Sequence, residues 1–77
     1  MNEKNILELI NKTFDVKLVE TDYDKKISDT IQWESFLIMT LLTEMMERYN
    51  KRIDLEALFS ANTIGELVTL LVGSKGK

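Results

Sequence analysis

The chain contains no proline, and its glycines stand only at positions 65, 73 and 76. Because proline is the residue that most strongly interrupts helices, nothing in this sequence prevents long helical segments. Apolar residues recur three and four positions apart in several separate stretches, which is the spacing of one face of an α-helix. Each stretch has one apolar side that must be buried against a neighbour, so we expect an all-α fold.

Two long helices are predicted, one over residues 3–14 and one over residues 35–49. Asn2 can cap the first, and Asn50 can end the second in a left-handed conformation. The apolar side of the first helix is expected to contain Ile6, Leu9, Ile10, Thr13 and Phe14. The inward side of the second is expected to contain Phe36, Met39, Leu42, Met45 and Tyr49, with Ile38 and Leu41 beside them. The solvent side of the second is expected to contain Leu37, Thr40, Glu44 and Glu47.

A short third helix is predicted over residues 54–60, and a last helix begins at Thr63. Asp54 can cap the short helix, and Thr63 and Glu66 have the spacing of a capping box. The inward residues of the short helix are expected to be Leu55, Leu58 and Phe59. Those of the last helix are expected to be Ile64, Leu67, Val68 and Leu71.

The connection between the two long helices covers residues 15–34. A connection of this length is long for a compact domain and commonly carries function or packs onto the core. Ile27, Ile31 and Trp33 are placed where they can attach it, so we expect an ordered loop. The predicted fold is a small four-helix bundle forming a single domain over residues 1–77, with an ordered core at about 3–72 and a flexible tail at 73–77.

Composition excludes several classes of function. The chain has no histidine and no cysteine, which removes Ser–His triads, Cys–His pairs and the usual zinc sites. A net charge of −3 with both signs mixed is unlike the basic stripe of a nucleic-acid-binding protein. No apolar run approaches the ~20 residues of a membrane span, and the first residues lack a secretory pattern. We expect a cytoplasmic monomer that is not an enzyme and binds no metal, nucleic acid or membrane.

Ser35 is the candidate functional residue, because it stands where a polar, turn-prone stretch ends and the second long helix begins. The start of a helix has unpaired backbone N–H groups and the positive end of the helix dipole, which both favour an anion. A hydroxyl there is also open to another macromolecule. The plain alternative is that Ser35 is simply a helix cap.

The residues Trp33-Glu34-Ser35-Phe36 resemble the Asp-Ser-Leu motif of the acyl and peptidyl carrier proteins. In that family the motif opens the second long helix, after a long loop and before a short third helix. Here the loop, the long helix, the short helix and the Thr63-Ile64 start of the last helix fall at similar positions. The resemblance covers about residues 3–72.

The resemblance implies that Ser35 carries a covalent 4'-phosphopantetheine arm derived from coenzyme A. A phosphopantetheinyl transferase would attach it with Mg²⁺, and the arm would then hold acyl or aminoacyl groups as thioesters for loading and condensing synthases. Glu34 and Phe36 would help present the arm. Glu34 replaces the family's aspartate, so fewer transferases are expected to modify this chain. Phe36 replaces the family's leucine and is expected to pack beneath the arm.

The expected partner face also differs from the acidic second helix of the bacterial fatty-acid carriers. We expect Leu37, Thr40, Met46 and Glu47 to contact partner enzymes. Apolar and methionine-rich centres are common in interfaces that depend less on charge. This favours a carrier of secondary metabolism, of the polyketide or nonribosomal peptide type.

The alternative function is a small helical protein–protein adaptor, a degenerate carrier without a prosthetic group. Several other residues have plain structural interpretations. Trp33 is more readily a core anchor for the loop than a contact of the arm, and the methionines are more readily packing residues than a cofactor site. Asp22, Asp24 and Asp29 lack the glycine and closing glutamate of a calcium loop, so solvated loop acids are favoured.

Overall fold

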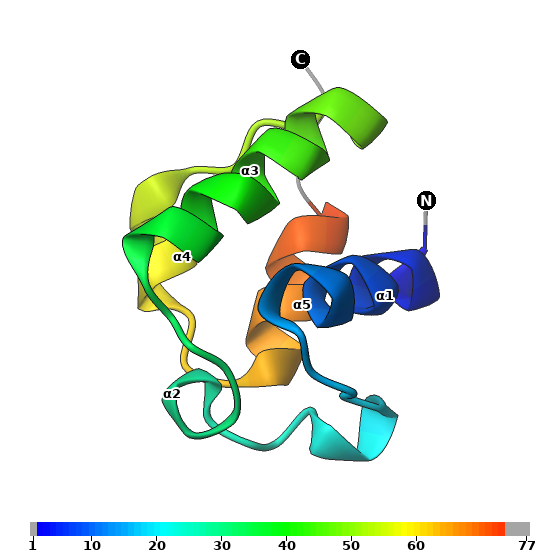
Figure 1. Cartoon of the computed structure of the whole chain (residues 1–77), viewed down its shortest axis with the longest axis vertical. Coiled ribbons are helices and arrows are strands. Elements are labelled where there is room, and N and C mark those ends of the chain that lie inside the picture. The colour runs from blue at the N-terminus through cyan, green and yellow to red at the C-terminus, as the bar shows by residue number, and fades with distance from the viewer. Residues whose placement is uncertain (1, 74–77) are drawn as a thin grey trace.

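The fold is a small bundle of helices, seen in the computed structural model of Figure 1, which describes residues 2–73. Within that range the helices, including one short 3-10 helix, are α1 (Glu3–Phe14), η1 (Glu20–Asp22), α2 (Ile27–Thr30), α3 (Ser35–Tyr49), α4 (Leu55–Ser60) and α5 (Ile64–Gly73). No strand occurs in the described range beyond a single antiparallel bridge between Lys26 and Thr63. The predicted all-α class is therefore confirmed.

The two long predicted helices are confirmed with their bounds, and so are the caps. The Asn2 side chain accepts a hydrogen bond of 2.9 Å from the Asn5 N–H, and Asn50 ends α3 with φ 53° and ψ 42°. Asp54 caps α4 by accepting a hydrogen bond from the Glu56 N–H. α5 extends through Gly73, so this residue belongs to the helix and not to the predicted tail; the rest of that predicted tail, 74–77, lies outside the described residues.

The core lies where α1, α3, α4 and α5 meet. α1 packs against both α3 and α5, and α4 packs against α5. The least exposed side chains of the described residues are Ile6, Ile10, Leu41, Met45, Leu58, Ile64, Leu67, Val68 and Leu71. Burial of this apolar surface is the dominant favourable contribution to folding in a chain that has no disulfide to help.

The predicted inward side of α3 is wrong for two residues. Phe36 is 76 % exposed and Met39 is 55 % exposed, whereas the fully buried residues are Ile38, Leu41 and Met45. These three lie at positions i, i+3 and i+7, which is one face of a helix. Phe36 therefore points into solvent and does not pack into the core beneath the helix start.

α4 differs from the prediction in the same way. Leu58 is fully buried, but Leu55 is 46 % exposed and Phe59 is 58 % exposed. Apolar side chains of α3 and α4 that sequence periodicity had placed in the core are thus on the surface. The residues concerned are Phe36, Met39, Leu55 and Phe59.

The long connection is ordered, as predicted, and includes η1 and α2. Ile27 and Ile31 are buried, and the Trp33 ring lies 5.9 Å from the ring of Phe14 between centroids. Backbone hydrogen bonds join the connection to the start of α5, among them Ile64 N–H to Lys25 O at 2.9 Å. These contacts fix the residues that lead into α3.

A side chain that the sequence did not single out holds the first part of the connection. Asn11 donates from Nδ2 to Leu18 O at 3.0 Å, and its Oδ1 accepts from the Leu18 N–H at 2.9 Å. Both bonds are partly buried, and they hold Leu18 against the core. The Asn11 side chain thus makes the hydrogen bonds that the backbone of Leu18 needs. The pattern of apolar residues cannot predict this role of a polar side chain.

Candidate functional site at the start of α3

Ser35 is the first residue of α3, and its side chain is exposed. The residues before it determine this position. Trp33 packs on Phe14, and the Glu34 N–H donates to Gln32 O at 3.0 Å. Glu34 then adopts an extended conformation, with φ −124° and ψ 158°, and the helix begins at the next residue. The prediction that a serine opens this helix at the surface is confirmed.

The first turn of α3 offers free hydrogen-bond donors. The first backbone bond of the helix runs from Ile38 N–H to Glu34 O at 2.9 Å. By helix geometry, the N–H groups of the three residues before Ile38 have no carbonyl partner within the helix. Among the described residues, the Glu34 side chain makes no capping hydrogen bond to them. An anionic group on the Ser35 hydroxyl would therefore meet free donors and the positive end of a helix dipole, which fits a phosphodiester.

Glu34 and Phe36 flank Ser35, and both side chains are exposed. The three predicted residues of the attachment site are therefore brought together on the surface. The Glu34 carboxylate is free to meet another molecule because it is not used as a cap.

The four predicted partner residues do not form one surface. Leu37 is partly buried and packs against the core, and the Thr40 hydroxyl donates to Phe36 O at 2.9 Å. Leu37 and Met46 are nine residues apart, which places them on opposite sides of α3. Glu47 is exposed and lies about two helical turns beyond Thr40.

Phe36 and Met39 are the exposed apolar residues near Ser35 that sequence reasoning placed in the core. Ile38, Leu41 and Met45 also form a helical face by themselves, so the sequence offers two candidate buried sides of this helix. The apolar residues of α3 lie on most sides of the helix, so periodicity could not choose the buried side by itself. The choice depends on where α1 packs.

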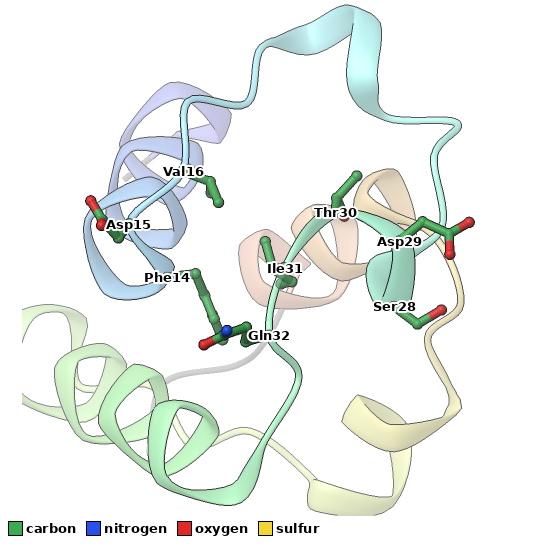
Figure 2. A pocket seen from close by; sticks show the side chains of 8 residues that line it. All are labelled: Phe14, Asp15, Val16, Ser28, Asp29, Thr30, Ile31 and Gln32. Carbon is green, nitrogen blue, oxygen red and sulfur yellow. The ribbon is translucent and has the colours of Figure 1, made fainter.

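A groove of about 460 Å³ lies near the entry to α3 and is separate from Ser35. It runs between the end of α1 and the segment from α2 to Gln32, and Figure 2 shows its lining residues. The carboxylates of Asp15 and Asp29 point away from the hollow in this view. Within residues 2–73 no cluster of three acidic side chains is arranged to hold a metal ion.

Three ionisable groups of the connection, Asp22, Tyr23 and Lys25, have shifted pKa values, and that of Lys25 is raised by its hydrogen bond to Asp22. The hydrogen bond from Lys25, at 2.8 Å, lowers the pKa of Asp22, and the Val19 N–H bond adds to this effect. Burial raises the pKa of Tyr23 to about 12, helped by the hydrogen bond of 3.0 Å that its hydroxyl donates to Glu3. Asp22 and Lys25 contact each other, Tyr23 contacts Glu3 of α1, and all three groups lie outside the Ser35 site.

Comparison with known proteins identifies a family. The family model described as "Phosphopantetheine attachment site" matches residues 5–71, a segment that includes Ser35 and all of α3. No curated protein and no solved structure matches the chain. None of the helices in the described part of the chain is long and apolar enough to cross a membrane.

Proposed function

Since the chain belongs to the phosphopantetheine-attachment family, a group of non-catalytic carrier domains that bear a covalent 4'-phosphopantetheine, we propose that Ser35 is its attachment residue. The observation that carries this proposal is the exposed Ser35 hydroxyl at the first residue of a 15-residue helix. The free N–H groups of that first turn support it, because they favour the phosphodiester that attachment creates.

Attachment needs a nucleophile but no catalytic base from this chain. The Ser35 Oγ forms a bond to a phosphorus of coenzyme A as the bond to the adenosine bisphosphate leaving group breaks, and the transferase accepts the hydroxyl proton. Glu34 lies beside the reacting hydroxyl on the exposed side, where its charge can contact the transferase or its Mg²⁺. The thiol of the bound arm supplies the thioester chemistry with which acyl or aminoacyl groups are carried.

We further propose that partner synthases dock on α3 next to Ser35, at a face that includes Thr40, Met46 and Glu47. Phe36 and Met39 add apolar area to this face, whereas a contact through Leu37 would need the partner to reach the other side of α3. The weakly charged character of this face supports a role in secondary metabolism, as a cytoplasmic monomer that serves polyketide or nonribosomal peptide synthases. A degenerate carrier that acts as an adaptor without the arm is the alternative.

The test is enzymatic attachment measured by intact mass. The chain is incubated with coenzyme A, Mg²⁺ and a phosphopantetheinyl transferase of broad specificity. We expect the mass to rise by one phosphopantetheine group in the native chain and in the matched variants Ser28→Ala and Ser60→Ala, whose serines are also exposed. Ser35→Ala should gain nothing. If several transferases leave the native chain unmodified, the adaptor alternative is favoured.

The choice between pathways is tested by binding of the arm-bearing form to isolated enzymes. We expect the protein to bind an adenylation or polyketide enzyme with little dependence on salt, because apolar contacts are not screened. Strong, salt-sensitive binding to a fatty-acid ketosynthase would contradict the secondary-metabolism proposal.

A further inference from the structure

A methionine-rich stripe begins at Ser35 and runs along α3. Ser35, Met39, Leu42 and Met46 stand at positions i, i+4, i+7 and i+11, so they share one side of the helix. Met39 is 55 % exposed and Met46 is 37 % exposed, whereas Met45 of the same helix is fully buried. The Cα of Met39 lies about 6 Å along the helix axis from that of Ser35, given the rise of an α-helix.

We propose that Met39, together with Met46, is an oxidation site whose sulfoxide weakens transfer of the arm onto Ser35. This inference rests on the proposed function of Ser35. An enzyme that delivers phosphopantetheine to Ser35 must approach the start of α3, and one turn further along that side it meets the exposed Met39 thioether. A thioether is soft and apolar and adapts to a partner surface. A sulfoxide is polar and must be desolvated when a partner covers it.

The chemical step uses a hydroperoxide, such as hydrogen peroxide. The thioether sulfur forms a bond to one peroxide oxygen as the O–O bond breaks. The proton on that oxygen passes to the departing hydroxide, which leaves as water. The sulfur is oxidised by two electrons and the peroxide is reduced by two electrons. A methionine sulfoxide reductase reverses the change.

The chain itself makes this chemistry selective. It contains no cysteine, so before the arm is attached methionine is its only sulfur-containing residue. Met39 and Met46 are open to a small oxidant, and Met45 is enclosed by the core in the same helix. Met45 therefore serves as an internal reference for accessibility.

The experiment treats the arm-free protein with hydrogen peroxide, locates the sulfoxides by peptide mass mapping, and then measures the rate of arm transfer. We expect Met39 and Met46 to be oxidised before Met45. We also expect kcat/KM for transfer to fall by about fivefold or more, mainly through KM, which is the scale of one significant interface side chain. Treatment with methionine sulfoxide reductase should restore the rate.

The matched control is the double variant M39L/M46L, which retains Met1 and Met45. Each protein is compared with its own untreated sample, and peroxide should leave the transfer rate of this variant unchanged. Circular dichroism checks that oxidised native chain remains folded. The inference is overturned if Met45 is oxidised first, if oxidised native chain accepts the arm at its untreated rate, or if the variant loses as much activity as the native chain.

The two proposals fail in different ways. If the untreated native chain accepts no arm, the proposed function fails and this inference falls with it. If the untreated chain accepts the arm and the sulfoxide form accepts it equally well, the function of Ser35 stands and only the oxidation site is refuted.

Discussion

Glu34 precedes the proposed attachment residue, and its carboxylate is exposed and makes no capping bond within the described residues. Its side chain is one methylene longer than that of the aspartate typical of the carriers that the chain resembles. The carboxylate can therefore extend further from the backbone than that of an aspartate. At this scale the chain differs from the typical motif in the acidic residue, while the proposed nucleophile is still a serine.

Shortening Glu34 to aspartate is expected to raise kcat/KM for arm transfer by about threefold, the effect of improving one exposed charge contact. The measurement is the initial rate of mass gain with a transferase of broad specificity. Glu8→Asp, an exposed acid on α1, is the matched control and should not change the rate. A slower Glu34→Asp variant would show that the longer side chain suits the transferase better.

The position of Ser35 could be predicted from the sequence because a turn-prone stretch gives way to a helical pattern at that residue. The exposure of Phe36 could not be predicted. Its spacing from Met39 and from later apolar residues is helical, so it fits a buried stripe as well as Ile38 does. Tertiary packing against α1 selected the side of α3 that contains Ile38.

At the scale of elements, α4 is a six-residue helix attached to the core by one side chain. Leu58 is fully buried, whereas Leu55 and Phe59 are exposed on the same helix. A helix this short has little stability of its own. Its place in the bundle therefore depends on Leu58 and on the Asp54 cap.

We expect Leu58→Ala to lower the free energy of unfolding by about 2–5 kcal/mol, because it removes buried methyl groups and leaves a cavity. Leu55→Ala, on the exposed side, should change it by about 0.5 kcal/mol or less. Urea unfolding, monitored by circular dichroism, measures the free energy of unfolding of both variants. Equal losses in the two variants would contradict the assignment of the buried side of α4.

A second contact between elements is the approach of α5 to the long connection. The Gly65 N–H donates to Tyr23 O at 2.9 Å, and a Cβ on Gly65 would lie 3.0 Å from that oxygen. A side chain at this position would push the connection away from the start of α5. The capping box formed by Thr63 and Glu66, which is confirmed, lies immediately beside this contact.

Gly65→Ala is accordingly expected to destabilise the protein by about 1–3 kcal/mol, the usual cost of overpacking. Gly73→Ala is the matched control, because a Cβ on Gly73 meets nothing within 4 Å. It should be neutral or slightly stabilising, since alanine favours helices over glycine. Thermal unfolding measures the melting temperature of both variants. If Gly65→Ala melts at the temperature of the native chain, the close contact between Gly65 and the connection is contradicted.

At the scale of the whole molecule, the long connection behaves as part of the domain. Asn11, Tyr23 and the backbone bonds to α5 attach it at several points. The sequence predicted an ordered connection from its apolar anchors. It could not predict η1, α2 or the role of Asn11, because these depend on polar contacts between residues distant from one another in the bundle.

The raised pKa of Tyr23 predicts a loss of stability in alkali. The folded state holds the phenol proton up to a pKa of about 12, whereas the unfolded chain releases it near the ordinary value of 10.0. The stabilisation is therefore complete below pH 10 and disappears as the pH rises from about 10 to 12.

The melting temperature of the native chain should thus fall more steeply between pH 9.5 and about 11.5 than that of Tyr23→Phe, which has no phenol proton to release. Tyr49→Phe, which retains Tyr23, is the matched control and should keep the steep decline. Parallel curves for the native chain and Tyr23→Phe would contradict the raised pKa of Tyr23, which burial and the hydrogen bond to Glu3 produce.

The whole account depends on which oxygen receives the arm. The most direct measurement is peptide mapping of the arm-bearing protein by tandem mass spectrometry, with release of the pantetheine group as the marker. We predict that the marker comes solely from the peptide that contains Ser35. An arm found on a peptide that contains another serine and lacks Ser35 would contradict the central claim.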